Sequence, residues 1–173
     1  PTMAETVKVL GLYARREPPE LDVLQAYGAA LAQVGRAQDA IATFERASAL
    51  DPSNAMTSAN LGTVYLMRGD LVRARELMEA ALRLEPGTAR AHNALGVIAK
   101  RGGHTEAAIG HWKRAVELNP QDWDTLFNLG SVLRTVGRSA EAHPYLKRFS
   151  EGAPPALYGP DLQKVTRWMG SSS

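Results

Sequence analysis

The chain has 173 residues, with 20 Lys and Arg against 18 Asp and Glu, and a formal net charge of +2. Hydrophobic residues make up 45% and charged residues 22%, a composition typical of a folded protein rather than a disordered one. The absence of Cys excludes disulfides and Cys-based metal or redox sites. No apolar run reaches the roughly 18 residues of a membrane-spanning helix, and so weak a positive charge does not predict nucleic-acid binding.

The compartment stays open, because a chain without Cys fits the cytoplasm and the bacterial periplasm equally well. The N-terminus shows no charged-then-apolar signal segment. Since the chain starts with Pro1 rather than Met and ends with three serines, we expect it to be a piece of a longer protein.

Prolines recur along the chain at a constant step of 34 residues, at Pro18, Pro52, Pro86, Pro120 and Pro154. Three further series keep the same step: Gly28, Gly62, Gly96 and Gly130; Gly35, Gly69, Gly103 and Gly137; and Ala40, Ala74, Ala108 and Ala142. Several residue types recurring in one register indicate internal structural repeats.

The first element, residues 3–16, is predicted to be the second helix of an incomplete unit. Leu10 and Tyr13 fall where Phe44 and Ala47 fall one repeat later, and Pro18 closes the segment. In this half-repeat the apolar residues of the N-terminal edge would have no preceding repeat to pack against. Self-association through this edge is therefore one alternative function.

Four full units follow, each predicted to be a helix, a tight turn and a second helix: residues 21–54, 55–88, 89–122 and 123–156. In the second unit, Leu61, Val64 and Tyr65 have the spacing of one helical face, and Gly69 suits the turn. Residues 71–84 then form a second amphipathic run. We expect Gly62 on the first helix to allow a close approach to Ala74 and Ala81 on the second.

The last element is a predicted capping helix over residues 160–169. Pro160 and Asp161 suit a first helical turn, and an apolar stripe ends at Met169. Because a terminal repeat has to cover its exposed core face, we expect this helix to cover Phe149, which replaces a small residue of the earlier units.

The pattern resembles the tetratricopeptide repeat family over residues 21–154. The first unit, for example, fills the family's diagnostic positions with Leu24, Tyr27, Gly28, Leu31, Ala40, Phe44, Ala47 and Pro52. The resemblance implies an all-α fold, a right-handed α-solenoid of antiparallel helix pairs whose first helices line a concave groove for extended peptides. It also implies a scaffold that binds proteins and takes no cofactor.

The segment of residues 153–168 is similar to the ends of repeat regions that some bacteria append to sulfatase-like hydrolases. This resemblance implies an alternative function, an accessory region of a larger hydrolase whose catalytic domain lies outside this chain.

No arrangement of catalytic residues stands out in the sequence. The four histidines, His92, His104, His111 and His143, do not share one helical face, so a metal site is not expected. Nothing resembles a nucleophile elbow or a phosphate-binding loop. We therefore expect neither an enzyme nor a metal protein in this chain.

The repeat register names the residues that would face the groove. The candidate peptide-binding residues are Gln25, Asn60, Thr63, Met67, Arg90, Asn93, Lys100, Arg101, Phe127, Asn128 and Arg134, with Ala29 and Gln33 on the same face. The chaperone-tail binders of the family clamp a carboxylate with five groove residues, and only Asn60 and Arg90 match them in part. That specific function is not expected.

Two features of these residues each allow two interpretations. Asn60, Asn93 and Asn128 would form a ladder that pairs with a peptide backbone, or else Asn is simply common at this place in such repeats. The basic groove residues favour an acidic peptide, or else they form a solvated face partly neutralised by Asp122 and Asp124. The leading hypothesis is a module that binds a peptide or a partner domain, with no nucleic acid and no membrane insertion.

Overall fold

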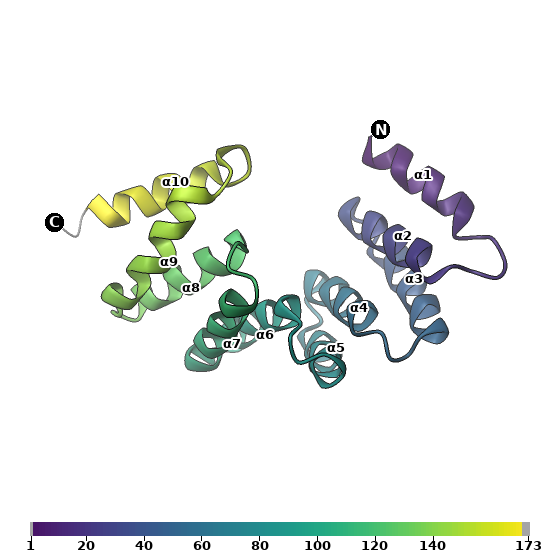
Figure 1. The fold of residues 1–173 in the computed structure, drawn as a ribbon, viewed down its shortest axis with the longest axis horizontal. Coiled ribbons are helices and arrows are strands. Elements are labelled where there is room, and N and C mark those ends of the chain that lie inside the picture. The colour runs from purple at the N-terminus through teal and green to yellow at the C-terminus, as the bar shows by residue number, and fades with distance from the viewer. Residues whose placement is uncertain (1, 171–173) are drawn as a thin grey trace. The chain divides into compact units, whose positions relative to one another are not determined.

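The computed structural model describes residues 2–170, and every regular element in that range is an α-helix (Figure 1). The helices are α1 (Met3–Tyr13), α2 (Leu21–Gln33), α3 (Ala37–Leu50), α4 (Ala55–Arg68), α5 (Leu71–Leu84), α6 (Ala89–Arg101), α7 (Thr105–Leu118), α8 (Trp123–Thr135), α9 (Ser139–Gly152) and α10 (Pro155–Gly170). The all-α prediction is confirmed. Residues 1 and 171–173, which the predicted repeat domain also includes, lie outside the described residues.

The chain divides into two compact units, one up to Ala94 and one from Leu95 on. In the first unit, α2 pairs with α3 and α4 with α5, while α3 packs on α4 and α1 packs on α2. In the second unit, α8 pairs with α9, α7 packs on α8, and α10 packs on α9. Within each unit these consecutive helices are therefore neighbours in space, as in a helical-hairpin repeat.

Each hairpin turn is made by a glycine with positive φ, because a side chain would be strained there. Gly35, Gly69, Gly103 and Gly137 have φ between 78° and 83°. In the first hairpin, Gly35 N donates to Ala32 O at 3.1 Å and Arg36 N donates to Leu31 O at 2.9 Å. These two bonds satisfy carbonyls at the end of α2 and turn the chain into α3.

The two helices of a pair meet where a glycine faces a large side chain. A Cβ added to Gly28 would lie 2.8 Å from the Phe44 ring, and one added to Gly130 would lie 2.5 Å from Leu146 Cδ2. Gly62 faces Met78 and Leu77, with the Ala74 carbonyl oxygen 3.3 Å from its Cβ position. The close approach expected between Gly62 and Ala74 is therefore observed, and the side chains of Met78 and Leu77 lie beside it.

Polar caps begin several first helices and explain where they start. Asn54 Oδ1 accepts a hydrogen bond from Thr57 N at 2.9 Å, and Asp122 Oδ1 accepts one from Thr125 N at 3.1 Å. Each cap follows a residue-proline pair, which disfavours continuation of the helix before it. The proline and the cap together separate one hairpin from the next.

The C-terminal helix covers the core of the second unit. Phe149 is fully buried, its ring lies 5.5 Å from that of Tyr158 in an edge-on contact, and Val165 is fully buried in the same cluster. Helical residues begin at Pro155, earlier than the predicted 160, with a break at Tyr158, whose φ is −117° and ψ is 16°. Burial and the carboxylate of Asp124 raise the pKa of Tyr158.

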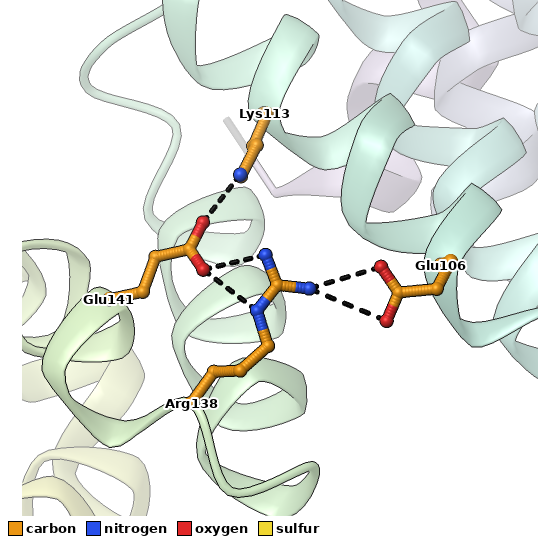
Figure 2. A network of polar contacts seen from close by, with 4 residues as sticks. All are labelled: Glu106, Lys113, Arg138 and Glu141. Atoms are coloured by element: carbon orange, nitrogen blue, oxygen red, sulfur yellow. Dashed lines mark hydrogen bonds and ion pairs between the residues drawn. The ribbon is translucent and has the colours of Figure 1, made fainter.

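A polar network joins α7 to α9 on the surface of the second unit (Figure 2). Arg138 contacts Glu141 through Nη2 at 2.6 Å and through Nε at 2.8 Å, and its Nη1 lies 3.0 Å from Glu106 Oε2. Lys113 pairs with the other oxygen of Glu141. Lys113 and Arg138 together hold the pKa of the Glu141 carboxyl below its usual value.

Candidate functional site

Four of the predicted groove residues line one pocket in the first unit: Asn60, Thr63, Met67 and Arg90. Ala29 and Gln33, which the same register placed on this face, also line it. The pocket encloses about 160 Å³ between α2, α4 and the start of α6. Its inner wall is apolar, because Phe44 and Val64 are buried, whereas Met67 is 64% exposed.

Sequence reasoning missed three pocket residues: Ala32, Phe44 and Val64. Phe44 belongs to α3, the second helix of its pair, and repeat register assigned it to the hairpin core. Its ring packs against α2 at Gly28, where an added Cβ would lie 2.8 Å from it. The repeat pattern gives no separate signal that Phe44 would line a pocket.

Gln25 connects consecutive first helices instead of facing an open groove. Its Nε2 donates to Thr57 Oγ1 at 2.9 Å and to Asn54 Oδ1 at 3.1 Å, which lie on α4 and at its cap. Both bonds are partly buried. Gln25 thus contributes to the packing of α2 on α4, and its amide is already engaged.

Asn60 and Arg90 are brought together as well. Arg90 Nη1 donates to Asn60 Oδ1 at 2.6 Å, and Asn60 is 9% exposed. While this bond holds, the amide oxygen of Asn60 is engaged by Arg90, so a bidentate contact with a peptide backbone would require a rearrangement. Arg90 itself is exposed, and the structure gives it no carboxylate partner among the described residues.

Two predicted groove residues of the second unit lie against the chain's own C-terminal helix. The Trp168 ring stacks on Phe127 with centroids 6.3 Å apart and planes 9° from parallel. The Arg134 guanidinium carbon lies 4.9 Å from the Trp168 centroid, and Lys164 Nζ lies 4.9 Å from it. The ring stack and the cation–π contacts bring Phe127 and Arg134 against α10, and both residues stay partly exposed.

The remaining predicted residues lie on α6 and α8. Asn93 on α6 and Asn128 on α8 are half-buried. Lys100 and Arg101 are exposed at the C-terminal end of α6. Over residues 2–170, no group of three or more acidic, His or Cys side chains is placed to hold a metal ion.

The chain matches a known protein family over most of its length. Sequence profiles of the tetratricopeptide repeat match residues 31–98, 89–122 and 111–143, which together run without a gap from 31 to 143. The chain belongs to the tetratricopeptide repeat family. The matched span includes α4, the start of α6 and the turn glycines from Gly35 to Gly137, whereas most of α2, with Ala29, lies before it.

Among curated proteins, one relative is the type IV pilus assembly protein PilF of Pseudomonas aeruginosa. It is 29% identical over 110 residues, which are 64% of this chain and 42% of PilF. The chain therefore spans less than half the length of this relative.

Solved structures of MamA share the fold. One MamA crystal structure has a TM-score of 0.69 at 21% identity, covering 86% of this chain and 87% of MamA. The MamA fragment from Desulfovibrio magneticus RS-1 has a TM-score of 0.68 at 27% identity, covering 86% and 84%. These likenesses confirm the antiparallel helix-pair architecture.

The tetratricopeptide repeat assignment makes this chain a protein-interaction scaffold rather than an enzyme, because such repeats serve as stacked binding surfaces. None of the helices between residues 2 and 170 combines the length and apolar character needed to cross a bilayer. The resemblance of residues 153–168 to regions beside sulfatase-like hydrolases stays a prediction, since the family profiles end at residue 143.

Proposed function

We propose that this module binds an extended, acidic peptide segment of a partner protein along the first-helix face of residues 21–94. The observation that supports this most directly is the pocket between α2 and α4, which collects Asn60, Thr63, Met67 and Arg90. A concave site with an apolar wall and a few polar groups is the usual form of a binding site in proteins. Met67 adds an exposed, flexible apolar surface that adapts to a ligand.

The charge of the site favours an acidic ligand. Arg90 is exposed and lacks a carboxylate partner among the described residues, so its positive charge is available to an incoming anion. The planar guanidinium group of arginine can bind a carboxylate through two parallel hydrogen bonds. Binding should therefore weaken as the salt concentration rises.

The test is capture of a partner by the immobilised chain, compared with capture by Arg90→Glu. The matched control is Arg83→Glu on the exposed surface of α5, outside the pocket. The proposal expects the captured protein to be lost with Arg90→Glu and kept with Arg83→Glu, with similar melting temperatures. Equal capture by both variants would overturn the proposal.

A further inference from the structure

The pocket of the first unit has the size and lining of a receptor for one side chain. Its volume is about 160 Å³, and apolar cavities of roughly 150 Å³ accept a group as large as benzene. The wall carries Ala29, Ala32, Phe44 and Val64, and no charged side chain besides Arg90 lines it. An aliphatic side chain would therefore lose its contact with water against this apolar wall, with the polar side chains of Gln33, Asn60 and Thr63 beside it.

The Asn60 hydrogen bond fixes where the one charge of the pocket lies. Arg90 Nη1 is held by Asn60 Oδ1 at 2.6 Å, and a guanidinium has five N–H donors, so several donors remain for a ligand. Asn60 is almost fully buried, which makes it a firm anchor for the exposed arginine. A guanidinium held in place loses less conformational entropy when it binds an anion.

We infer that this pocket selects a peptide in which an aliphatic side chain of leucine size lies next to a carboxylate. The aliphatic group enters the pocket between α2 and α4, and the carboxylate pairs with Arg90. This inference rests on the proposed function and adds the class of residue that the site recognises. The carboxylate is that of a neighbouring Asp or Glu side chain, in keeping with the acidic peptide segment of the proposed function.

The experiment titrates the ¹⁵N-labelled chain with four synthetic peptides in one Gly/Ser frame and follows the backbone amide signals of the pocket residues. The first peptide has an internal Leu-Glu pair and capped ends. The second has Ala for Leu, the third has Gln for Glu, and the fourth ends in Leu with a free carboxylate and no acidic side chain. Expected affinity losses are about tenfold for Ala and about fivefold for Gln, from lost apolar burial and a lost charge-assisted hydrogen bond.

Two protein variants locate the subsite. Ala29→Leu fills the pocket and should weaken the Leu-Glu peptide about tenfold. Ala42→Leu adds the same group to an exposed position of the second helix α3, outside the pocket, and should leave affinity unchanged. The peptide series uses the unaltered chain, so it decides the question even where Ala29→Leu destabilises the fold.

Each outcome has a defined meaning. Preference for the internal Leu-Glu peptide over the other three supports the inference. Preference for the free C-terminal Leu would assign the carboxylate to a chain terminus and overturn the inference. Equal binding of the Leu and Ala peptides, full affinity in Ala29→Leu, or no pocket shifts at about 1 mM peptide would overturn it. Arg90-dependent capture of a partner would still stand in those cases, so failure of the inference is distinguishable from failure of the proposed function.

Discussion

Arg90 on α6 donates a hydrogen bond from Nη1 to the side-chain oxygen of Asn60 on α4, with 2.6 Å between the two atoms. The bond crosses from one repeat to the next and satisfies an amide that is 9% exposed. It is therefore both a structural link within the first unit and the feature that positions a cation at the pocket.

This link predicts energetic coupling between the two side chains. Asn60→Ala and Arg90→Ala, alone and together, should give a coupling energy of about 1 kcal/mol in a double-mutant cycle, because a hydrogen bond to a charged group is lost once. Urea unfolding of the four proteins measures it. Losses that simply add, within about 0.3 kcal/mol, would show that the bond contributes no stability.

The glycine facing Leu146 predicts opposite effects for two Gly-to-Ala substitutions. Gly130→Ala should destabilise the chain by about 2 kcal/mol, because its new Cβ would lie 2.5 Å from Leu146 Cδ2. Gly110→Ala is the matched control, since Gly110 is exposed within α7 and its Cβ would meet nothing within 4 Å. There the helix should gain about 0.5–1 kcal/mol. Equal effects of the two substitutions in thermal unfolding would contradict this packing.

The stacking of Trp168 on Phe127 predicts that the Trp168 side chain stabilises the packing of α10. Trp168→Ala should cost about 2 kcal/mol, because it removes an aromatic stack and the cation–π contacts of Arg134 and Lys164. Leu157→Ala, at a position of α10 that is 77% exposed, should change stability by less than about 0.5 kcal/mol. Fluorescence-monitored denaturation compares the two, and an equally small cost for Trp168→Ala would rule out the stack as a stabilising contact.

The polar network of α7 and α9 predicts a pH-dependent contribution to stability. Because Lys113 and Arg138 lower the pKa of Glu141, its carboxylate stabilises the fold above the ordinary carboxyl pKa. That contribution disappears as the pH falls through the lowered value. The melting temperature of Glu141→Gln should therefore be below that of the unaltered chain at pH 7, and the two should converge in acid. A constant gap from pH 7 to pH 2 would contradict the assignment.

The exposed apolar residues of the N-terminal helix α1 predict weak self-association of the chain. Val9 is 51% and Leu12 is 64% exposed on α1, and Val9 and Leu10 line an open apolar depression there. Light scattering over a concentration series should show a rising mass that Leu12→Ser together with Val9→Ser abolishes. The control is Val72→Ser, an equally exposed apolar residue of α5. A strictly monomeric mass at every concentration would remove this expectation.

Much of the fold was predictable because the residues that recur every 34 positions include glycine and proline, which have strong backbone preferences. The glycines from Gly35 to Gly137 mark turns that need positive φ, and the prolines mark where second helices stop. The contact of α10 with Phe127 was not predictable in this way, since α10 falls outside the 34-residue pattern. Its early start at Pro155 also lies outside that pattern, and its break at Tyr158 falls just before Gly159-Pro160, where the proline ring disfavours a continuous helix.

The candidate site was predictable in part for the same reason. Register placed Asn60, Thr63, Met67 and Arg90 on one face, and the structure gathers them around one pocket. Register alone does not say which side chains bond to each other. The engagement of Gln25 with Thr57, and of Asn60 with Arg90, depends on the distance between neighbouring helices rather than on the pattern along each one.

The most direct test of the binding account is site-specific photocrosslinking of the chain in its native cells. A photoreactive phenylalanine at Met67, the exposed wall of the pocket, should crosslink to a partner protein, whereas the same group at Val72 on α5 should not. Added Arg90→Glu should remove the Met67 crosslink. Crosslinks that form equally at both positions, or only at Val72, would contradict binding at the first-helix face.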